Sequence, residues 1–191
     1  MLNIIIFGAP GSGKGTQSVK IAERYGLEHV STGDVIRAEI EGGTEFGKKA
    51  DALISKGLLI PDDIMISKLD EIMQKRNGVK GFILDGFPRT LAQGEVLDKM
   101  LEKNAQKVSI VLNLEVEEDE LVSRILKRGE ISGRSDDNKE IIESRLKVYH
   151  EQTEPLKQFY SEQFKLVRIF GQGDIDDIFS QIAAVIDRII D

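Results

Sequence analysis

The sequence predicts an α/β fold in which a five-stranded parallel sheet lies between two layers of helices. Short apolar runs, typical of strands buried on both faces, alternate along the chain with longer segments whose apolar residues recur at helical spacing. This alternation indicates parallel strands joined by helical crossovers. With 191 residues, 40% of them hydrophobic and 31% charged, the chain suits one such domain with small insertions.

Each predicted strand is a short apolar run bounded by glycine or polar residues. After the second run, the small hydrogen-bonding residues of 31–34 indicate a turn and a helix start. Gly42 and Gly43 divide the helical stretch that follows into two. The segment 31–60 is therefore predicted to be a small helical insertion between core elements. The strands are predicted at 2–7, 27–30, 81–85, 108–112 and 166–170.

The predicted helices have recognisable starts and interruptions. Pro61 starts the helix that leads to the third strand. The acidic run 115–120 is interpreted as favourable charge at a helix N-terminus. A polar, glycine-punctuated loop is predicted over 129–137. The first helix is predicted to start at Gln17, two short helices lie within 35–55, and further helices start at Pro61 and at about Leu121. Another helix is predicted over 90–102. A long polar helix is predicted over 138–164, and an amphipathic helix over 175–189.

A glycine-rich loop joins the first strand to the first helix, and this order predicts a phosphate-binding loop. Its glycines let consecutive N–H groups face a phosphate chain, and the helix adds the positive end of its dipole. Lys14 supplies a full charge for the β- and γ-phosphates. The general motif has Ser or Thr directly after the lysine, whereas this chain has Gly15 there and its hydroxyl at Thr16. A plain glycine turn is the alternative, but the flanking strand and helix favour a nucleotide. The loop reads Gly8-Ala9-Pro10-Gly11-Ser12-Gly13-Lys14-Gly15-Thr16.

Asp85 ends an apolar strand, as the second acid of P-loop enzymes does. We expect it to meet Mg²⁺ through water, and the alternative is an acid that caps a turn. Arg124 and Arg128 lie four residues apart on one predicted helix, a like-charge spacing that favours a bound anion. Solvated surface is the better interpretation of any single arginine, but a set at the carboxyl edge of the sheet favours polyphosphate binding. The set is Arg37, Arg89, Arg124, Arg128, Arg134 and Arg145.

Composition excludes several functions. The net charge of −7 argues against a general nucleic-acid binder, and no apolar run approaches membrane-spanning length. The first strand begins at the N-terminus, so no signal peptide is expected. The absence of cysteine excludes disulfides and cysteine-ligated zinc, and a cytoplasmic location is expected. Neither His29 nor His150 has the spacing of a catalytic base or metal ligand, and both are expected to be structural.

Four motifs together resemble those of the adenylate kinases, in their short-lid, zinc-free form, over essentially the whole chain. The variant Gly-Lys-Gly-Thr is that family's own form of the phosphate loop. Val35-Ile36 stand where the family commonly has two of Leu or Met, which is a conservative difference. The motifs are Gly8 through Gln17, Ser31-Thr32-Gly33-Asp34, Asp85-Gly86-Phe87-Pro88-Arg89 and Gly133-Arg134-Ser135-Asp136-Asp137.

The resemblance implies a P-loop NTPase three-layer fold: a core of 1–30, 61–126 and 138–191, a nucleoside-monophosphate domain at 31–60 and a lid at 127–137. It implies reversible phosphoryl transfer, ATP + AMP = 2 ADP, by a monomer, with Mg²⁺ bound with ATP and no zinc. ATP would be held by Gly11, Ser12, Gly13, Lys14, Gly15, Thr16, Arg124, Arg128 and Gly173. AMP would be held by Thr32, Arg37, Leu58, Leu59, Ile60, Gly86, Phe87, Pro88, Arg89 and Gln93, with Arg134 and Arg145 bridging the phosphates. Catalysis would rest on Lys14, Arg89, Arg124, Arg128, Arg134 and Arg145.

Two alternatives stay open at this point. A UMP/CMP kinase would share the whole architecture, although Thr32 and Thr90 resemble the adenylate type, where the pyrimidine enzymes typically place alanine and asparagine. A nucleotide-binding module without turnover is the other alternative. The number of arginines argues against it, since binding alone would not need so many.

Overall fold

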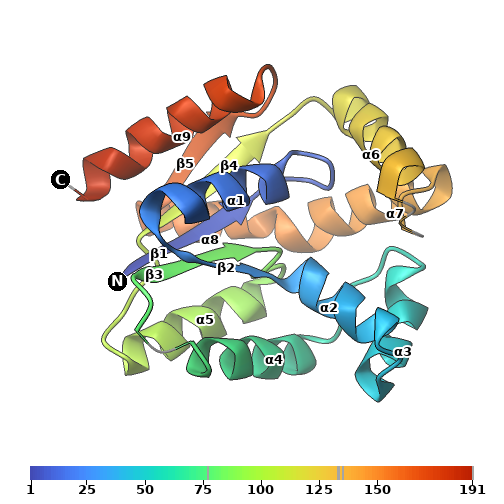
Figure 1. The fold of residues 1–191 in the computed structure, drawn as a ribbon, viewed down its shortest axis with the longest axis horizontal. Helices are drawn as coiled ribbons and strands as arrows, with labels where there is room; N and C mark the ends of the chain where they lie inside the picture. The colour runs from blue at the N-terminus through green and yellow to red at the C-terminus, as the bar shows by residue number, and fades with distance from the viewer. Residues whose placement is uncertain (77, 133, 135, 191) are drawn as a thin grey trace.

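The sheet of the protein is five-stranded and parallel throughout, in the order β2-β3-β1-β4-β5 (Figure 1). The computed structural model describes residues 1–76, 78–132, 134 and 136–190. Because all strands run the same way, their carboxyl ends lie at one edge of the sheet, where α/β proteins bind ligands. The strands are β1 Leu2–Phe7, β2 Glu28–Ser31, β3 Gly81–Asp85, β4 Ile110–Glu115 and β5 Leu166–Phe170.

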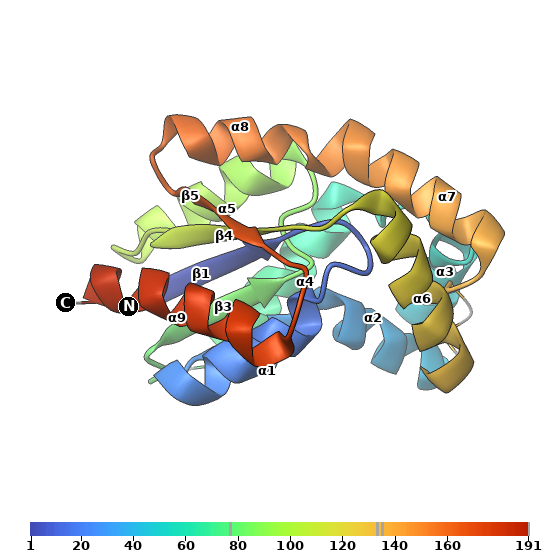
Figure 2. The same ribbon diagram turned by 90° about the horizontal axis from the view of Figure 1, so that it is seen from above.

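Helices cover both faces of this sheet, which confirms the predicted three-layer α/β fold. Alternate residues of β1 point to opposite faces. Ile4 and Ile6 pack in one cluster with α1 (Lys14–Tyr25) and α9 (Ile175–Ile190). Ile5 and Phe7 pack in the other, with α4 (Asp62–Gln74), α5 (Leu91–Lys103) and α8 (Pro155–Glu162). Seen from above, α1 and α9 lie on one side of the strands and α5 and α8 on the other (Figure 2).

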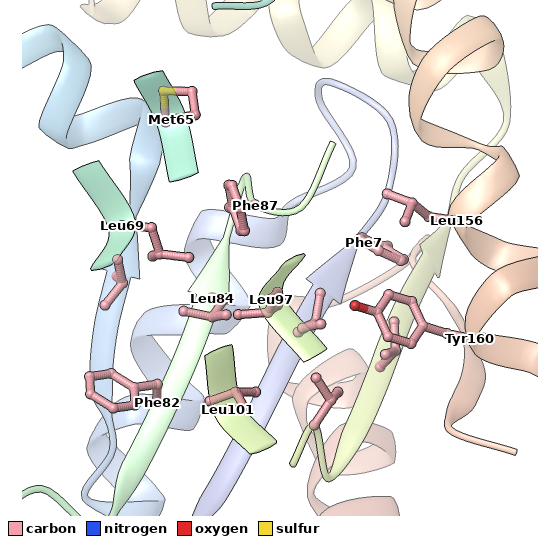
Figure 3. Packing of buried hydrophobic residues seen from close by; sticks show 14 of the residues in the cluster. Phe7, Met65, Leu69, Phe82, Leu84, Phe87, Leu97, Leu101, Leu156 and Tyr160 are labelled. Atoms are coloured by element: carbon pink, nitrogen blue, oxygen red, sulfur yellow. The ribbon is translucent and has the colours of Figure 1, made fainter. Parts of the chain in front are cut away.

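The second cluster anchors the strands that carry the site. Leu84 of β3 lies beside Leu97 of α5, and Phe7 of β1 lies beside Leu156 and Tyr160 of α8 (Figure 3). The ring centroids of Phe7 and Tyr160 are 5.9 Å apart. Burial of each such side chain contributes about 1.5–3 kcal/mol. The ends of β1 and β3 are thereby held firmly where the phosphate loop and Asp85 begin.

Two helical pairs extend beyond the carboxyl edge of the sheet (Figure 1). The first is α2 (Thr32–Glu41) and α3 (Glu45–Ile54), with Gly42 and Gly43 between them as expected. The side chain of Ser31 accepts a hydrogen bond from the N–H of Asp34 at 3.3 Å and caps α2. The second pair is α6 (Glu118–Ser132) and α7 (Lys139–Val148). None of the helices among the described residues is both long and apolar enough to span a membrane.

The prediction of a loop over 129–137 is wrong for its first four positions, because α6 continues to Ser132. Gly129 was expected to begin the loop, but it is helical. A Cβ at Gly129 would lie 2.7 Å from the carbonyl oxygen of Asp137. The glycine therefore permits the returning chain to approach α6 closely and does not end the helix. Gly133 and Ser135 of the predicted lid lie outside the described residues.

The single long helix predicted over 138–164 is also corrected. The structure has α7, a π-helical turn at Tyr149–Thr153 and then α8, which follow one another nearly in line (Figure 2). Within this turn the N–H of Glu154 bonds the carbonyl of Tyr149 at 2.9 Å, five residues back. Pro155 has no N–H to continue the α-helical pattern at this point, which explains the change. The fourth strand also lies later than predicted, at 110–115 instead of 108–112.

Candidate active site

One cavity of about 820 Å³ lies at the carboxyl edge of the sheet. The ends of β1 and β3 form its floor, and residues of α2, α6, α7 and the π-helical turn form its walls. Every residue that the sequence analysis assigns to ATP, AMP or Mg²⁺ lines this cavity. The structure thus brings together segments that lie up to 172 positions apart in the chain, from Ile6 to Ile178.

The glycine loop packs closely against α6. Gly11 has a φ of +85°, and a Cβ there would lie 2.8 Å from the carbonyl oxygen of Leu121. Only glycine tolerates both the backbone conformation and the contact. Gly13, also left-handed, precedes α1, whose first-turn N–H groups have no acceptor within the helix. These N–H groups and the helix dipole form a site for a phosphate group.

The ammonium group of Lys14 is held by the loop itself. Its Nζ donates to the carbonyl oxygens of Gly8 at 2.7 Å and Ala9 at 2.9 Å. Burial lowers the pKa of Lys14 to about 8. The negative charge of Asp85 raises this pKa in part, and the positive charge of Arg89 lowers it further. The lysine is therefore charged below about pH 8 and lies at the mouth of the phosphate loop.

Asp85 lies across from the start of α1. A Cβ at Gly15 would lie 3.6 Å from Oδ2 of Asp85, so the larger Ser or Thr of the general motif would reduce this space. The carboxylate of Asp85 and the hydroxyl of Thr16 are oxygen donors of the kind that Mg²⁺ binds. Across residues 1–76, 78–132, 134 and 136–190, no three His, Asp or Glu side chains form a metal-binding group. The residues present thus fit a Mg²⁺ ion whose other ligands are phosphate and water oxygens.

Two arginines of the α6–α7 segment share one buried carboxylate. Arg128 makes two hydrogen bonds to Asp137, both 2.7 Å long. Arg145 reaches the same carboxylate at 2.9 Å and Asp136 at 2.8 Å. The side chain of Asp137 is fully buried. Burial raises the pKa of Asp137, but the hydrogen bonds and charges of Arg128 and Arg145 outweigh it and the pKa is lowered.

Arg124 and Arg89 are each oriented by one or two oxygen atoms. Arg124 donates to Glu120 at 2.7 Å and to the carbonyl of Gly171 at 3.1 Å, and Arg89 donates to the carbonyl of Gly86 at 2.8 Å. Burial and the charges of neighbouring arginines lower the pKa of Arg89 and of Arg134. Such crowding of positive charge favours an anionic ligand. The basic side chains along the described part of the wall are Lys14, Arg37, Arg89, Arg124, Arg128, Arg134 and Arg145.

The opposite end of the cavity, next to α2, combines apolar and hydrogen-bonding groups. The hydroxyl of Thr32 donates to the carbonyl of Asp85 at 3.3 Å. A Cβ at Gly86, where φ is +81°, would lie 2.7 Å from that hydroxyl oxygen, so glycine is required there. Gln93 is buried, and its Oε1 accepts a hydrogen bond from the N–H of Arg89 at 2.7 Å. The apolar side chains here include Ile36, Ile54, Leu59, Ile60 and Met65.

Comparison with known proteins gives a consistent result. A family profile described as adenylate kinase matches residues 6–165. The chain belongs to the adenylate kinase family. It is 55% identical over 189 residues to the adenylate kinase of Bacteroides thetaiotaomicron, covering 99% of this chain and 100% of that protein. It is 51% identical to that of Parabacteroides distasonis, with the same coverage, and 47% identical to that of Porphyromonas gingivalis, covering 98% and 97%.

Sequence reasoning missed some residues of this adenylate kinase site. His29 was expected to be structural only, yet it lines the cavity, and its Nε2 lies 3.8 Å from Oδ2 of Asp85. Its position two residues before the cap of α2 was the available signal. Thr153, which also lines the cavity and donates to the carbonyl of Arg89 at 2.9 Å, had no signal because it lies in the π-helical turn. His150 instead pairs with Glu154 at 2.8 Å on the surface.

The adenylate kinase motif at 133–137 is described only in part. Gly133 and Ser135 lie outside the described residues. Arg134 lines the same cavity as Asp34 and Arg37 of α2. Burial raises the pKa of Asp34, but the hydrogen bonds from Arg37 and Ser31 and the charges of Arg37 and Arg134 outweigh it, and the pKa is lowered.

Proposed function

We propose that this protein transfers the γ-phosphoryl group of ATP to AMP, reversibly, to give two ADP. The observation that carries the proposal is that one arginine-lined cavity has the phosphate-binding loop at one end and apolar and hydrogen-bonding groups at the other. A donor and an acceptor nucleotide need two such subsites whose phosphates meet. Membership of the adenylate kinase family supports the same conclusion.

In this proposal ATP occupies the end of the cavity next to α1. The N–H groups of 11–16 hold its phosphates, and Lys14 leaves the carbonyls of Gly8 and Ala9 to contact the β- and γ-phosphates. Arg124, Arg128 and Gly173 complete the site. Mg²⁺, bound with ATP and held through water by Asp85, would neutralise phosphate charge.

AMP occupies the end next to α2. Thr32 and Gln93 contact the base, with Gly86, Phe87 and Pro88 behind it and the segment 58–60 on the other side. Arg37 and Arg89 hold the AMP phosphate, and Arg134 and Arg145 bridge the two phosphate groups. The bridging arginines keep the reacting oxygens in line.

Phosphoryl transfer depends on positioning and charge stabilisation more than on a general base. The transferred group spreads negative charge over its oxygens, and the fixed guanidinium groups lie where that charge develops. We propose that 127–137 acts as a lid and 31–60 as the monophosphate domain, and that both close over the substrates. Closure excludes water, which would otherwise compete with AMP as the acceptor.

We propose that the protein acts as a monomer in the cytoplasm, where ATP and AMP are available, without nucleic-acid or membrane partners. Sedimentation at several protein concentrations tests the monomeric state.

A panel of acceptors tests the proposed function. The protein is incubated with Mg·ATP and either AMP, UMP, CMP or GMP, and diphosphate formation is followed by chromatography. AMP should be the strongly preferred acceptor. A higher rate with UMP or CMP would instead assign the protein to the pyrimidine kinases.

A further inference from the structure

Asp62, at the start of α4, contacts a cavity-lining side chain from behind. Its Oδ1 accepts a hydrogen bond from Nε2 of Gln93 at 2.7 Å, and its Oδ2 accepts one from the hydroxyl of Thr90 at 2.9 Å. Gln93 lines the cavity, whereas Asp62 and Thr90 are absent from its lining among the described residues. The carboxylate therefore acts on a ligand only through Gln93.

The amide of Gln93 is held between two partners of opposite kind. An ionised carboxylate can only accept hydrogen bonds, so Asp62 requires the amide nitrogen to face it. The backbone N–H of Arg89 can only donate, and it requires the amide oxygen, which it reaches at 2.7 Å. Turning the amide over would place its oxygen against the carboxylate of Asp62 and its nitrogen against the N–H of Arg89. Gln93 is thus fixed in one orientation.

This orientation decides which purine edge Gln93 can match. Adenine presents a donor at N6 and an acceptor at N1, whereas guanine and hypoxanthine present an acceptor at O6 and a donor at N1. An amide that turns freely can pair with either edge, because its oxygen and nitrogen exchange places. An amide in a fixed orientation pairs with one edge and opposes the other, and unpaired buried polar groups are strongly disfavoured.

We infer that Asp62 is a positioning residue that makes the acceptor site selective for adenine over 6-oxopurines by fixing Gln93. The inference rests on the proposed function, in which Gln93 contacts the base of AMP. Gln93 is 2% exposed, and its remaining amide hydrogen and the second lone pair of Oε1 are the groups it can offer to a base. The charged acceptor makes the contact with Asp62 stronger than a neutral hydrogen bond.

Thr90 links this arrangement to the backbone. Its hydroxyl accepts from the N–H of Gln93 at 3.2 Å, which caps α5, while it donates to Asp62. The same hydroxyl therefore fixes the backbone of Gln93 and one oxygen of Asp62. This gives a physical reason for a threonine at the position where the resemblance distinguishes adenylate from pyrimidine kinases.

The test compares Asp62→Asn with Asp63→Asn. Both carboxylates lie in the first turn of α4, so the two variants lose the same favourable charge at the helix N-terminus, but Asp63 is solvent-exposed. Asparagine at position 62 keeps the size of the side chain but can turn its own amide nitrogen toward Gln93, so only the N–H of Arg89 then holds the orientation of the Gln93 amide. Asp62→Ala, which removes both contacts, serves as the second variant. KM and kcat are measured for AMP, IMP and ATP, together with Tm.

The inference predicts that Asp62→Asn raises KM for AMP about tenfold and raises the rate with IMP relative to AMP. KM for ATP and Tm should stay at the values of Asp63→Asn, and Asp62→Ala should change KM for AMP in the same direction. Equal values of KM for AMP and of the IMP-to-AMP ratio in the two asparagine variants would overturn the inference. A matched rise of KM for both AMP and ATP with a lower Tm would overturn it too, because that pattern indicates a structural role alone. If the unsubstituted protein itself prefers another acceptor, the proposed function fails, and this is visible before any variant is compared.

Discussion

Arg128 and Asp137 form a two-pronged ion pair with both N–O distances at 2.7 Å, and the carboxylate is fully buried. Planar guanidinium and carboxylate groups match in this geometry as guanidinium and phosphate do. Asp137 thus orients Arg128 and Arg145 along the cavity wall. The pair joins α6 to the chain that leads into α7, beside the closely packed Gly129.

Replacing Asp137 by asparagine should destabilise the protein. The substitution leaves Arg128 and Arg145 without their shared counter-charge, and breaking a buried pair from one side costs about 3 kcal/mol. The folded-state pKa of Asp137 is lowered, so its contribution is present at neutral pH and is lost as the pH falls below its ordinary value of 3.8. Urea unfolding should show a difference at pH 7 that narrows in acid. The exposed Asp51→Asn is the control, and an equal effect of the two variants would contradict this role.

Lys14→Met should reduce turnover by about 10²–10³-fold while the protein stays folded, since the lysine points at the phosphate site. In the unsubstituted protein, ATP affinity should fall as the pH rises above about 8, where Lys14 loses its proton. The methionine variant should lack this pH dependence. Calorimetric titration of ATP into the parent and the methionine variant between pH 7 and 9 measures this pH dependence. Near-normal turnover in the folded variant would mean that the phosphate-binding loop takes no part in the mechanism.

Arg134→Ala should lower AMP phosphorylation strongly and weaken ATP binding less. Arg134 follows α6 in the chain and lines the same cavity as Asp34 of α2. In the proposed function Arg134 bridges the two phosphate groups, so its loss should increase the share of ATP lost to hydrolysis. Arg168→Ala, at an exposed arginine of β5, is the matched control. Transfer at the parent rate in Arg134→Ala would mean that the segment is only a connector.

The parts of the fold that follow from local pattern could be predicted from the sequence. The order of strands and helices and the helix start at residues 31–34 are examples. Contacts between distant segments could not be predicted. Gly129 has the pattern of a helix end, and only the approach of Asp137 explains why it lies inside α6. The π-helical turn likewise depends on how Pro155 alters a hydrogen-bond pattern that periodicity does not reveal.

The site was predictable to the same extent. Residues in motifs could be named from the sequence, and the structure brings them to one cavity. The residues that orient them could not be named, because they are distant in the chain and contact the motif residues only in the folded protein. Asp62 supports Gln93 from 31 positions away, and nothing in its local sequence distinguishes it from Asp63.

A zinc-specific chelator should leave the Tm unchanged. The α6–α7 segment is held by the ion pairs of Arg128 and Arg145 with Asp136 and Asp137, and the chain has no cysteine to ligate zinc. Thermal unfolding followed by circular dichroism, with the zinc-loaded chelator as control, is the measurement. A clear fall in Tm with the free chelator alone would reveal a structural metal.

If one cavity holds two adenine nucleotides and exchanges a phosphoryl group between them, the protein must also convert ADP alone. The most direct test supplies the protein with Mg·ADP as its only nucleotide and follows the products by chromatography. We expect ATP and AMP in equal amounts, with Lys14→Met and Arg134→Ala far slower than the parent. AMP and free phosphate without ATP would indicate a hydrolase, and unchanged ADP would indicate a binding module; either result would contradict phosphoryl exchange between two bound nucleotides.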